Sequence, residues 1–164
     1  MLFDRRNTLF LALGGCISAC GFKPVYKEGS TASSLQGQIE ISLIKGRNGF
    51  ELREELESKL GRTVSVAPYV LALKLTISEM GLAVTEDEGT TRTSLNGIAA
   101  FTLTRRGTGK VIFRDSVSNL TAYGTTSATY PSTVARRDAN IRLMKALAAQ
   151  IANRIAITSD GWAN

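Results

Sequence analysis

The residues best suited to chemistry in this chain are the run Ile17-Ser18-Ala19-Cys20, near the N-terminus. The run has the form of a bacterial lipobox, in which a branched apolar residue and two small residues precede a cysteine. The cysteine thiol becomes the thioether that carries diacylglycerol, and the amine freed by cleavage can take a further acyl chain. We therefore predict cleavage between Ala19 and Cys20 and a covalent lipid on Cys20, because several acyl chains anchor a protein stably whereas one is marginal.

The residues before this cysteine have the order of a secretory signal peptide. Arg5 and Arg6 are followed by an uncharged, mostly apolar stretch over residues 8–22, shorter than the about 20 residues that a spanning helix needs. A buried N-terminal helix is the alternative, and it fits less well because no helix cap precedes the stretch. Cys16 is a second, weaker cleavage match, because cleavage there leaves a very short apolar run.

Composition excludes most common enzyme chemistries. The chain has no histidine among its 164 residues, which excludes His-based triads, His general bases and His metal ligands. Both cysteines lie within the first twenty residues, so the rest of the chain has no thiol nucleophile, disulfide or thiolate zinc site. We expect no enzyme, no metal and no cofactor apart from the lipid on Cys20. A hydrolase with a Ser/Lys pair is the least favoured alternative.

The charge balance predicts an anionic partner. The formal net charge is +6 at pH 7, and a basic exported domain favours phosphate-bearing lipid, lipopolysaccharide or an acidic protein. Nucleic acid is disfavoured, since the basic residues form no long run. Arg105, Arg106 and Lys110 form the sharpest basic cluster, at a predicted turn, and are candidate contacts for lipopolysaccharide phosphates. The blander alternative, which we favour, is that these charges keep a turn solvated and a sheet edge from aggregating.

Hydrophobic periodicity predicts the elements that position these residues. Apolar and polar residues alternate over 39–43, over 71–77 with an extension past Met80, over about 91–104, and from 111 to about 120. Within the third of these strands, the expected apolar positions are Ile98, Ala100 or Phe101, and Leu103. Leucines at positions 52, 56 and 60 predict a helix that Asn48 caps and Gly61 ends.

A second, longer helix is predicted to close the domain, with Ser132 or Thr133 as its cap. Its apolar stripe consists of Ile141, Met144, Ala148, Ile151 and Ile155, widened by Leu143 and Leu147. Residues 123–131 before it are predicted to form a Ser/Thr-rich loop between Tyr123 and Tyr130, a candidate partner-contact loop.

Together these elements predict an α+β fold of order β-α-β-β-β-α, with two helices packed on one face of a four-stranded mixed sheet. The chain divides into a signal peptide (1–19), a lipidated N-terminus and flexible tether (20–37), one α/β domain (38–157) and a frayed tail (158–164).

The run Cys20-Gly21-Phe22-Lys23-Pro24-Val25-Tyr26 resembles the start of the LptE family of lipopolysaccharide-assembly lipoproteins, which often reads Cys-Gly-Phe-x-x-x-Tyr. The order of elements is similar too, as is a final helix entered through Tyr130-Pro131-Ser132, and the long Ser/Thr tether resembles the alphaproteobacterial branch. Gly21 after the cysteine resembles lipoproteins that are sorted to the outer membrane.

This resemblance implies a non-enzymatic, lipid-anchored protein of the Gram-negative outer membrane. Such a protein would sit inside an LptD-type β-barrel as a plug, help that barrel assemble, and take part in lipopolysaccharide transport. Its partners would be the barrel, lipopolysaccharide and, through the acyl anchor, outer-membrane lipid. The alternative is another periplasmic lipid-binding or barrel-pilot lipoprotein.

Overall fold

The computed structural model describes residues 31–63, 65–82, 91–125 and 128–163. The predicted signal peptide, the cleavage site at Ala19 and Cys20, and Cys16 therefore lie outside the described residues. Within the part that the structure describes, no helix combines the length and the apolar character needed to cross a membrane.

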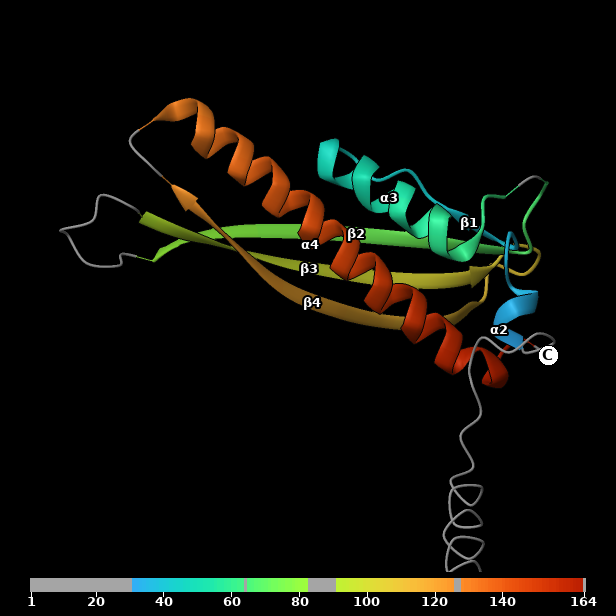
Figure 1. Cartoon of the computed structure of the whole chain (residues 1–164). Helices are drawn as coiled ribbons and strands as arrows, with labels where there is room; N and C mark the ends of the chain where they lie inside the picture. The colour runs from blue at the N-terminus through green and yellow to red at the C-terminus, as the bar shows by residue number, and fades with distance from the viewer. Residues whose placement is uncertain (1–30, 64, 83–90, 126–127, 164) are drawn as a thin grey trace, which may run out of the picture.

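Four strands form one sheet in the order β1-β2-β3-β4 (Figure 1). They are β1 (Ile39–Ile41), β2 (Tyr69–Leu82), β3 (Thr91–Arg105) and β4 (Val111–Thr125). β1 pairs with β2 in parallel, and the two other pairs are antiparallel. The sheet therefore joins one parallel pair to an antiparallel meander of β2, β3 and β4.

Two helices, α3 (Arg47–Leu60) and α4 (Thr129–Thr158), lie together on one face of this sheet (Figure 1). The short helix α2 (Thr31–Ser34) and the 3-10 turn η2 (Ser159–Gly161) meet at the end of the domain where α4 stops. The predicted order β-α-β-β-β-α and the mixed sheet are therefore confirmed, and the structure adds α2 and η2.

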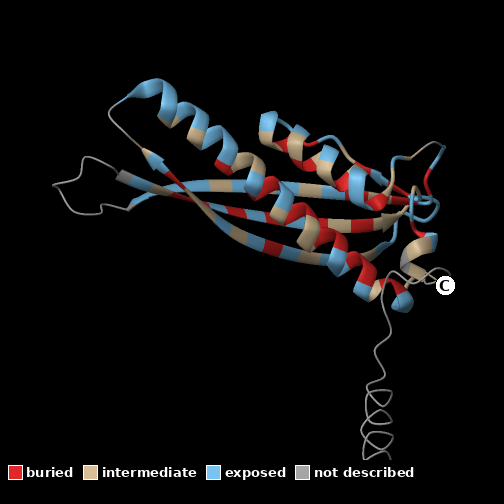
Figure 2. Cartoon of the chain, in the orientation of Figure 1, coloured by how far each residue is buried: buried red, intermediate tan, exposed pale blue. Residues whose placement is uncertain are grey.

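The core lies between the helices and the sheet, where buried positions line the inner side of both helices (Figure 2). Odd-numbered residues of β2 and β3 face the helices, because side chains of a strand alternate between its two faces. The largest fully buried side chains are Phe101, Ile39, Leu52, Leu56, Leu71, Leu95, Leu103, Leu143, Met144, Leu147, Ile151 and Ile155. Each such side chain contributes about 2 kcal/mol of transfer free energy, so this layer dominates the stability of the fold.

The alternation of side chains between the two faces of β3 shows that part of its predicted core was wrong. Leu95, Phe101 and Leu103 are buried, whereas Ile98 keeps 42% of its surface exposed on the opposite face, together with Ala100. The apolar character of Ile98 was therefore a misleading signal, since strand parity decides which face a side chain occupies.

The first strand is also shorter than predicted. β1 ends at Ile41, and Leu43 is 81% exposed while Ile44 is buried. Asn48 is not the N-cap of α3, because the helix begins at Arg47 and Gly46 occupies the N-cap position. The Asn48 amide instead donates a hydrogen bond to Asn140 Oδ1 at 3.0 Å, so it joins α3 to α4.

The predicted loop over residues 123–131 is wrong for most of its length. β4 continues to Thr125, so Tyr123 is a strand residue, and α4 begins at Thr129, so Tyr130 is a helix residue. Ser132 and Thr133 lie in the first turn of α4, where their hydroxyls donate to the carbonyls of Ala128 and Thr129. Pro131 fits there because the first turn needs no N–H donors.

Both ends of the domain are better packed than predicted. Leu35, within the predicted flexible tether, is buried. At the other end Ser159 is buried, and Trp162 stacks edge-to-face on Tyr69 with ring centroids 5.3 Å apart. Residues 158–163 are therefore part of the fold rather than a frayed tail, because an indole that covers the core holds them in place.

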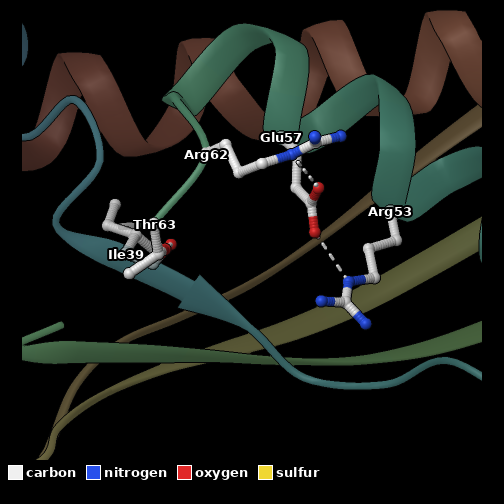
Figure 3. A network of polar contacts seen from close by, with 5 residues as sticks. All are labelled: Ile39, Arg53, Glu57, Arg62 and Thr63. Carbon is white, nitrogen blue, oxygen red and sulfur yellow. Dashed lines mark hydrogen bonds and ion pairs between the residues drawn. The ribbon is translucent and has the colours of Figure 1, made fainter. Parts of the chain in front are cut away.

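A polar network fixes the point where the chain leaves α3 (Figure 3). The carboxylate of Glu57 accepts hydrogen bonds from Arg53 Nε at 2.8 Å and from Arg62 Nε at 3.2 Å. Thr63 Oγ1 then donates to the carbonyl of Ile39 at 3.1 Å. The exit of the helix is thereby held against β1, which sets where β2 begins.

Gly61 ends α3 beside Gly37, as the sequence predicted for Gly61. It has φ 83°, and a Cβ built on it would lie 2.6 Å from the backbone nitrogen of Gly37. The Gly37 N–H also donates to the carbonyl of Leu60 at 2.8 Å, so the two segments cannot move apart without losing that bond.

We predict that Gly61→Ala lowers the free energy of unfolding by about 1–3 kcal/mol, because alanine is strained at positive φ. Denaturant unfolding followed by circular dichroism measures this. Gly107→Ala is the matched control, since nothing lies within 4 Å of its added Cβ. Equal stabilities of the two variants would show that the Gly61–Gly37 approach does not constrain the fold.

Candidate functional site

The predicted basic cluster lies at the hairpin between β3 and β4, and two of its three members have partners within the fold. Arg106 donates from Nε to the carbonyl of Ala67 at 2.9 Å, and its Nη2 pairs with the carboxylate of Glu40. Arg105 donates from Nη2 to the carbonyl of Trp162 at 3.2 Å, and its guanidinium lies 5.6 Å from the Tyr69 ring centroid. The two arginines therefore tie the hairpin to β1, to the start of β2 and to the C-terminal turn.

Lys110 is different. Its side chain is exposed and belongs to none of the ion pairs found between residues that the structure describes. The ammonium group of Lys110 therefore has no ion pair among the described residues, whereas the guanidinium groups of Arg105 and Arg106 already donate hydrogen bonds to protein oxygens. This geometry strengthens the blander alternative for Arg105 and Arg106.

The two tyrosines do not act as a pair. Tyr123 is 8% exposed, and its hydroxyl donates to Glu79 Oε2 at 3.4 Å. Tyr130 is 80% exposed on the first turn of α4. Only Tyr130 is placed where a partner could contact it.

A second basic region lies at the start of α3, beside the first turns of α4. The N-terminal turns of α4 extend beyond the start of α3 (Figure 1), and an open cleft of about 500 Å³ lies between these helices and β2. Arg47 of α3 and Arg136 and Arg137 of α4 line this cleft, together with the apolar side chains of Ile77 and Ile141. Residues far apart in the sequence thereby form one surface, which we call the arginine cleft.

The acidic side chains of the arginine cleft are Glu51 and Glu79. Glu51 lies 3.9 Å from Arg47, at the limit of an ion pair, and Glu79 accepts the Tyr123 hydroxyl. Arg136 and Arg137 take part in none of the ion pairs between described residues. Two guanidinium groups without an ion pair, next to the apolar side chains of Ile77 and Ile141, could bind a phosphate or carboxylate that is attached to an apolar group.

The sequence alone did not reveal the arginine cleft. Arg136 and Arg137 lie nearly 90 residues after Arg47 in the sequence, and only the α3–α4 packing brings the three side chains to one cleft. The bond from Asn48 to Asn140 joins the two helices beside the cleft, and no local sequence signal predicts a hydrogen bond between residues so distant along the chain.

A protein-family model described as "LptE: Lipopolysaccharide-assembly" matches residues 37–155, from just before β1 to near the end of α4. No curated protein sequence matches the chain.

Solved structures share the fold. A crystal structure described as a lipoprotein from Caulobacter crescentus CB15 is 23% identical, with a TM-score of 0.69, and the match covers 82% of this chain and 99% of that one. The structure of a minor lipoprotein from Acinetobacter baumannii is 18% identical, with a TM-score of 0.56, over 73% of this chain and 92% of that one. At these identities the likeness concerns the fold.

We predict that Arg105→Ala lowers the free energy of unfolding by about 1–2 kcal/mol, because it removes a charged hydrogen bond and a cation–π contact. Lys110→Ala, on the same hairpin, should change it by less than about 0.5 kcal/mol. Urea unfolding of both variants tests this. A larger loss for Lys110→Ala would contradict the structural role assigned to Arg105.

Proposed function

Because this chain belongs to the LptE family of lipopolysaccharide-assembly lipoproteins, we propose that it plugs an LptD-type β-barrel in the outer membrane and helps that barrel assemble. The observation that carries the proposal is the family match over residues 37–155, which includes the whole sheet, α3 and all but the last three residues of α4. The family is one of assembly proteins rather than enzymes, which agrees with a chain that lacks histidine.

The two-layered architecture supports a plug. The helices cover one face of the sheet, while the even-numbered residues of its three long strands form an open face of mostly small or uncharged side chains, such as Thr76, Ala100 and Ser118. The charged residues of these strands on that face are Lys74, Arg92 and Arg114, all basic. A surface whose charged side chains are all basic favours a barrel wall that carries acidic residues.

We further propose that Cys20 carries the membrane anchor. The lipobox is the observation behind this step, and the described domain begins only about ten residues later, at Thr31. A chain of ten residues spans at most about 35 Å, so the anchor would keep the domain within a short distance of the membrane surface.

For lipopolysaccharide, we propose the arginine cleft as the principal phosphate site. Arg136 and Arg137 are unengaged, and the apolar floor of Ile77 and Ile141 can receive an acyl chain. The hairpin residues Arg105, Arg106 and Lys110 would be a secondary contact, because Arg105 and Arg106 already bind protein oxygens.

We predict that the full-length protein, isolated from detergent-solubilised outer membranes, brings a large β-barrel protein with it. Depletion should reduce the amount of mature barrel, and intact mass should report a diacylglyceryl thioether on a chain that begins at Cys20. Mass spectrometry of the recovered proteins is the measurement. Tight binding of a lipid with no barrel recovered would favour the alternative, a periplasmic lipid-binding or pilot lipoprotein.

We predict that the double variant Arg136→Glu/Arg137→Glu binds lipopolysaccharide at least about tenfold more weakly at low salt, a loss of about 1.4 kcal/mol. Lys110→Glu is the matched charge reversal on the hairpin and should cost less than about threefold. Titration of immobilised protein with lipopolysaccharide measures both. The reverse order of effects would assign the phosphates to the hairpin and reject the cleft.

A further inference from the structure

The outer edge of β2 is paired for only a small part of its length. β1 pairs with residues 69–71, whereas β2 continues to Leu82 (Figure 1). The Tyr69 N–H donates to the carbonyl of Gln38 at 3.3 Å, and the carbonyl of Leu71 accepts from the Ser42 N–H at 2.9 Å. The odd-numbered residues of β2 therefore direct their backbone polar groups toward this edge.

Beyond Leu71 the same alternation continues without a neighbouring strand. Leu73, Leu75 and Ile77 direct an N–H and a carbonyl outward, and no other strand in the described ranges pairs with them on that side. Natural edge strands are commonly protected by a proline, a bulge or an inward-pointing charge. Residues 73–77 have no proline, and the side chains on the helix side are two leucines and an isoleucine. Lys74 is the one charged residue of this segment, and it lies on the open face of the sheet rather than on the helix side.

A groove runs beside this edge. It has a volume of about 500 Å³ and lies between β2 and the connection that leads from β1 to α3. Leu73, Leu75 and Ile77 form one side of it, and Leu43, which is 81% exposed, belongs to the other. We call this feature the β2 edge groove. It combines a row of backbone donors and acceptors with apolar side chains at alternate positions, which is what an added β-strand requires.

The charge of the groove indicates what kind of strand fits. Lys45 and Arg47 are its charged lining residues, and no acidic side chain lines it. Lys45 takes part in none of the ion pairs between described residues, and Arg47 has only the 3.9 Å contact with Glu51. A carboxylate on the occupant would therefore meet Lys45 without a competing acid, whereas at Arg47 it would compete with the Glu51 contact.

We propose that the β2 edge groove binds an extended segment of the barrel partner as an additional strand of the sheet. The segment would place apolar side chains at every second position against Leu73 and Leu75, and a carboxylate next to Lys45; Arg47 and Ile77, at the far end of the groove, also line the arginine cleft. Backbone hydrogen bonds would supply affinity, and the side-chain alternation would supply register. The identity of the partner rests on the proposed function, whereas the chemistry of the strand rests on the groove alone.

Site-specific photo-crosslinking in cells tests the occupant. A benzophenone amino acid at position 43 should capture one segment of the barrel, rich in alternating apolar residues and carrying Asp or Glu. The same amino acid at position 76, on the open face, reports barrel contact independently of the groove. Capture of a second copy of this chain, or of its own residues 21–30, at position 43 would overturn the proposal.

Hydrogen exchange adds a backbone readout. In the isolated full chain the amides of Leu73, Leu75 and Ile77 should exchange rapidly, and in the purified complex at least about tenfold more slowly. Unchanged exchange, with position 76 still cross-linking to the barrel, would reject the groove and leave the plug intact. If no barrel is recovered, the proposed function fails. The groove proposal then fails as well, unless position 43 captures a strand that carries Asp or Glu, has apolar side chains at every second position, and protects these amides.

Variants separate backbone pairing from side-chain contact. Leu75→Pro removes an outward N–H that the isolated sheet does not use, and Leu75→Ala removes only the side chain. We expect the proline variant to lose at least about tenfold more barrel in co-purification than the alanine variant. Lys45→Glu should also weaken recovery, whereas Lys59→Glu, on the last turn of α3, should not. Thermal unfolding shows whether each variant is folded. If the proline variant does not fold, the comparison of Lys45→Glu with Lys59→Glu still tests the proposal.

Discussion

The structure depends on burial at a single face of the sheet. The long strands place their odd-numbered apolar side chains toward α3 and α4, and the fully buried leucines, isoleucines and Phe101 lie in that one layer. α4 spans the sheet diagonally and packs on β3 and β4, whereas α3 packs beside it and contacts β1, so each helix covers a different part of this layer. Among the described residues, no helix or strand covers the other face of the sheet, and no strand pairs with β2 beyond Leu71 on its outer edge.

Charge is used in two different ways in this small basic domain. At the β3–β4 hairpin, Arg105 and Arg106 bind backbone oxygens and a carboxylate, so their charge stabilises the joint between the hairpin, β1 and the C-terminal turn. At the arginine cleft, Arg136 and Arg137 lie on the surface of α4 beside apolar residues and form no ion pair with any residue in the described ranges. A cluster of like charges in a sequence therefore predicts a ligand site only when the tertiary structure leaves the groups unsatisfied.

Much of the fold could be predicted from patterns of short range. The four-residue spacing of Leu52, Leu56 and Leu60 predicted α3, and Gly61 ends it as expected because its φ is positive. The same reasoning gave wrong predictions at Asn48 and Ile98. Asn48 has the chemistry of an N-cap but bonds to Asn140 on another helix, and Ile98 is apolar but lies on the outer face because Phe101 and Leu103 set the parity of the strand.

The sequence by itself determined the class of protein: a lipobox, one α+β domain without histidine, and a family-like order of elements. Periodicity and residue chemistry are local properties, so they can be recognised without knowing the fold. Only the tertiary structure decided which cations form ion pairs or hydrogen bonds with protein oxygens. It also decided that Arg47 lines one cleft with Arg136 and Arg137, and that most of the β2 edge has no neighbouring strand within the described residues. These features depend on contacts between distant segments, whose geometry is set by how two helices and a twisted sheet pack together.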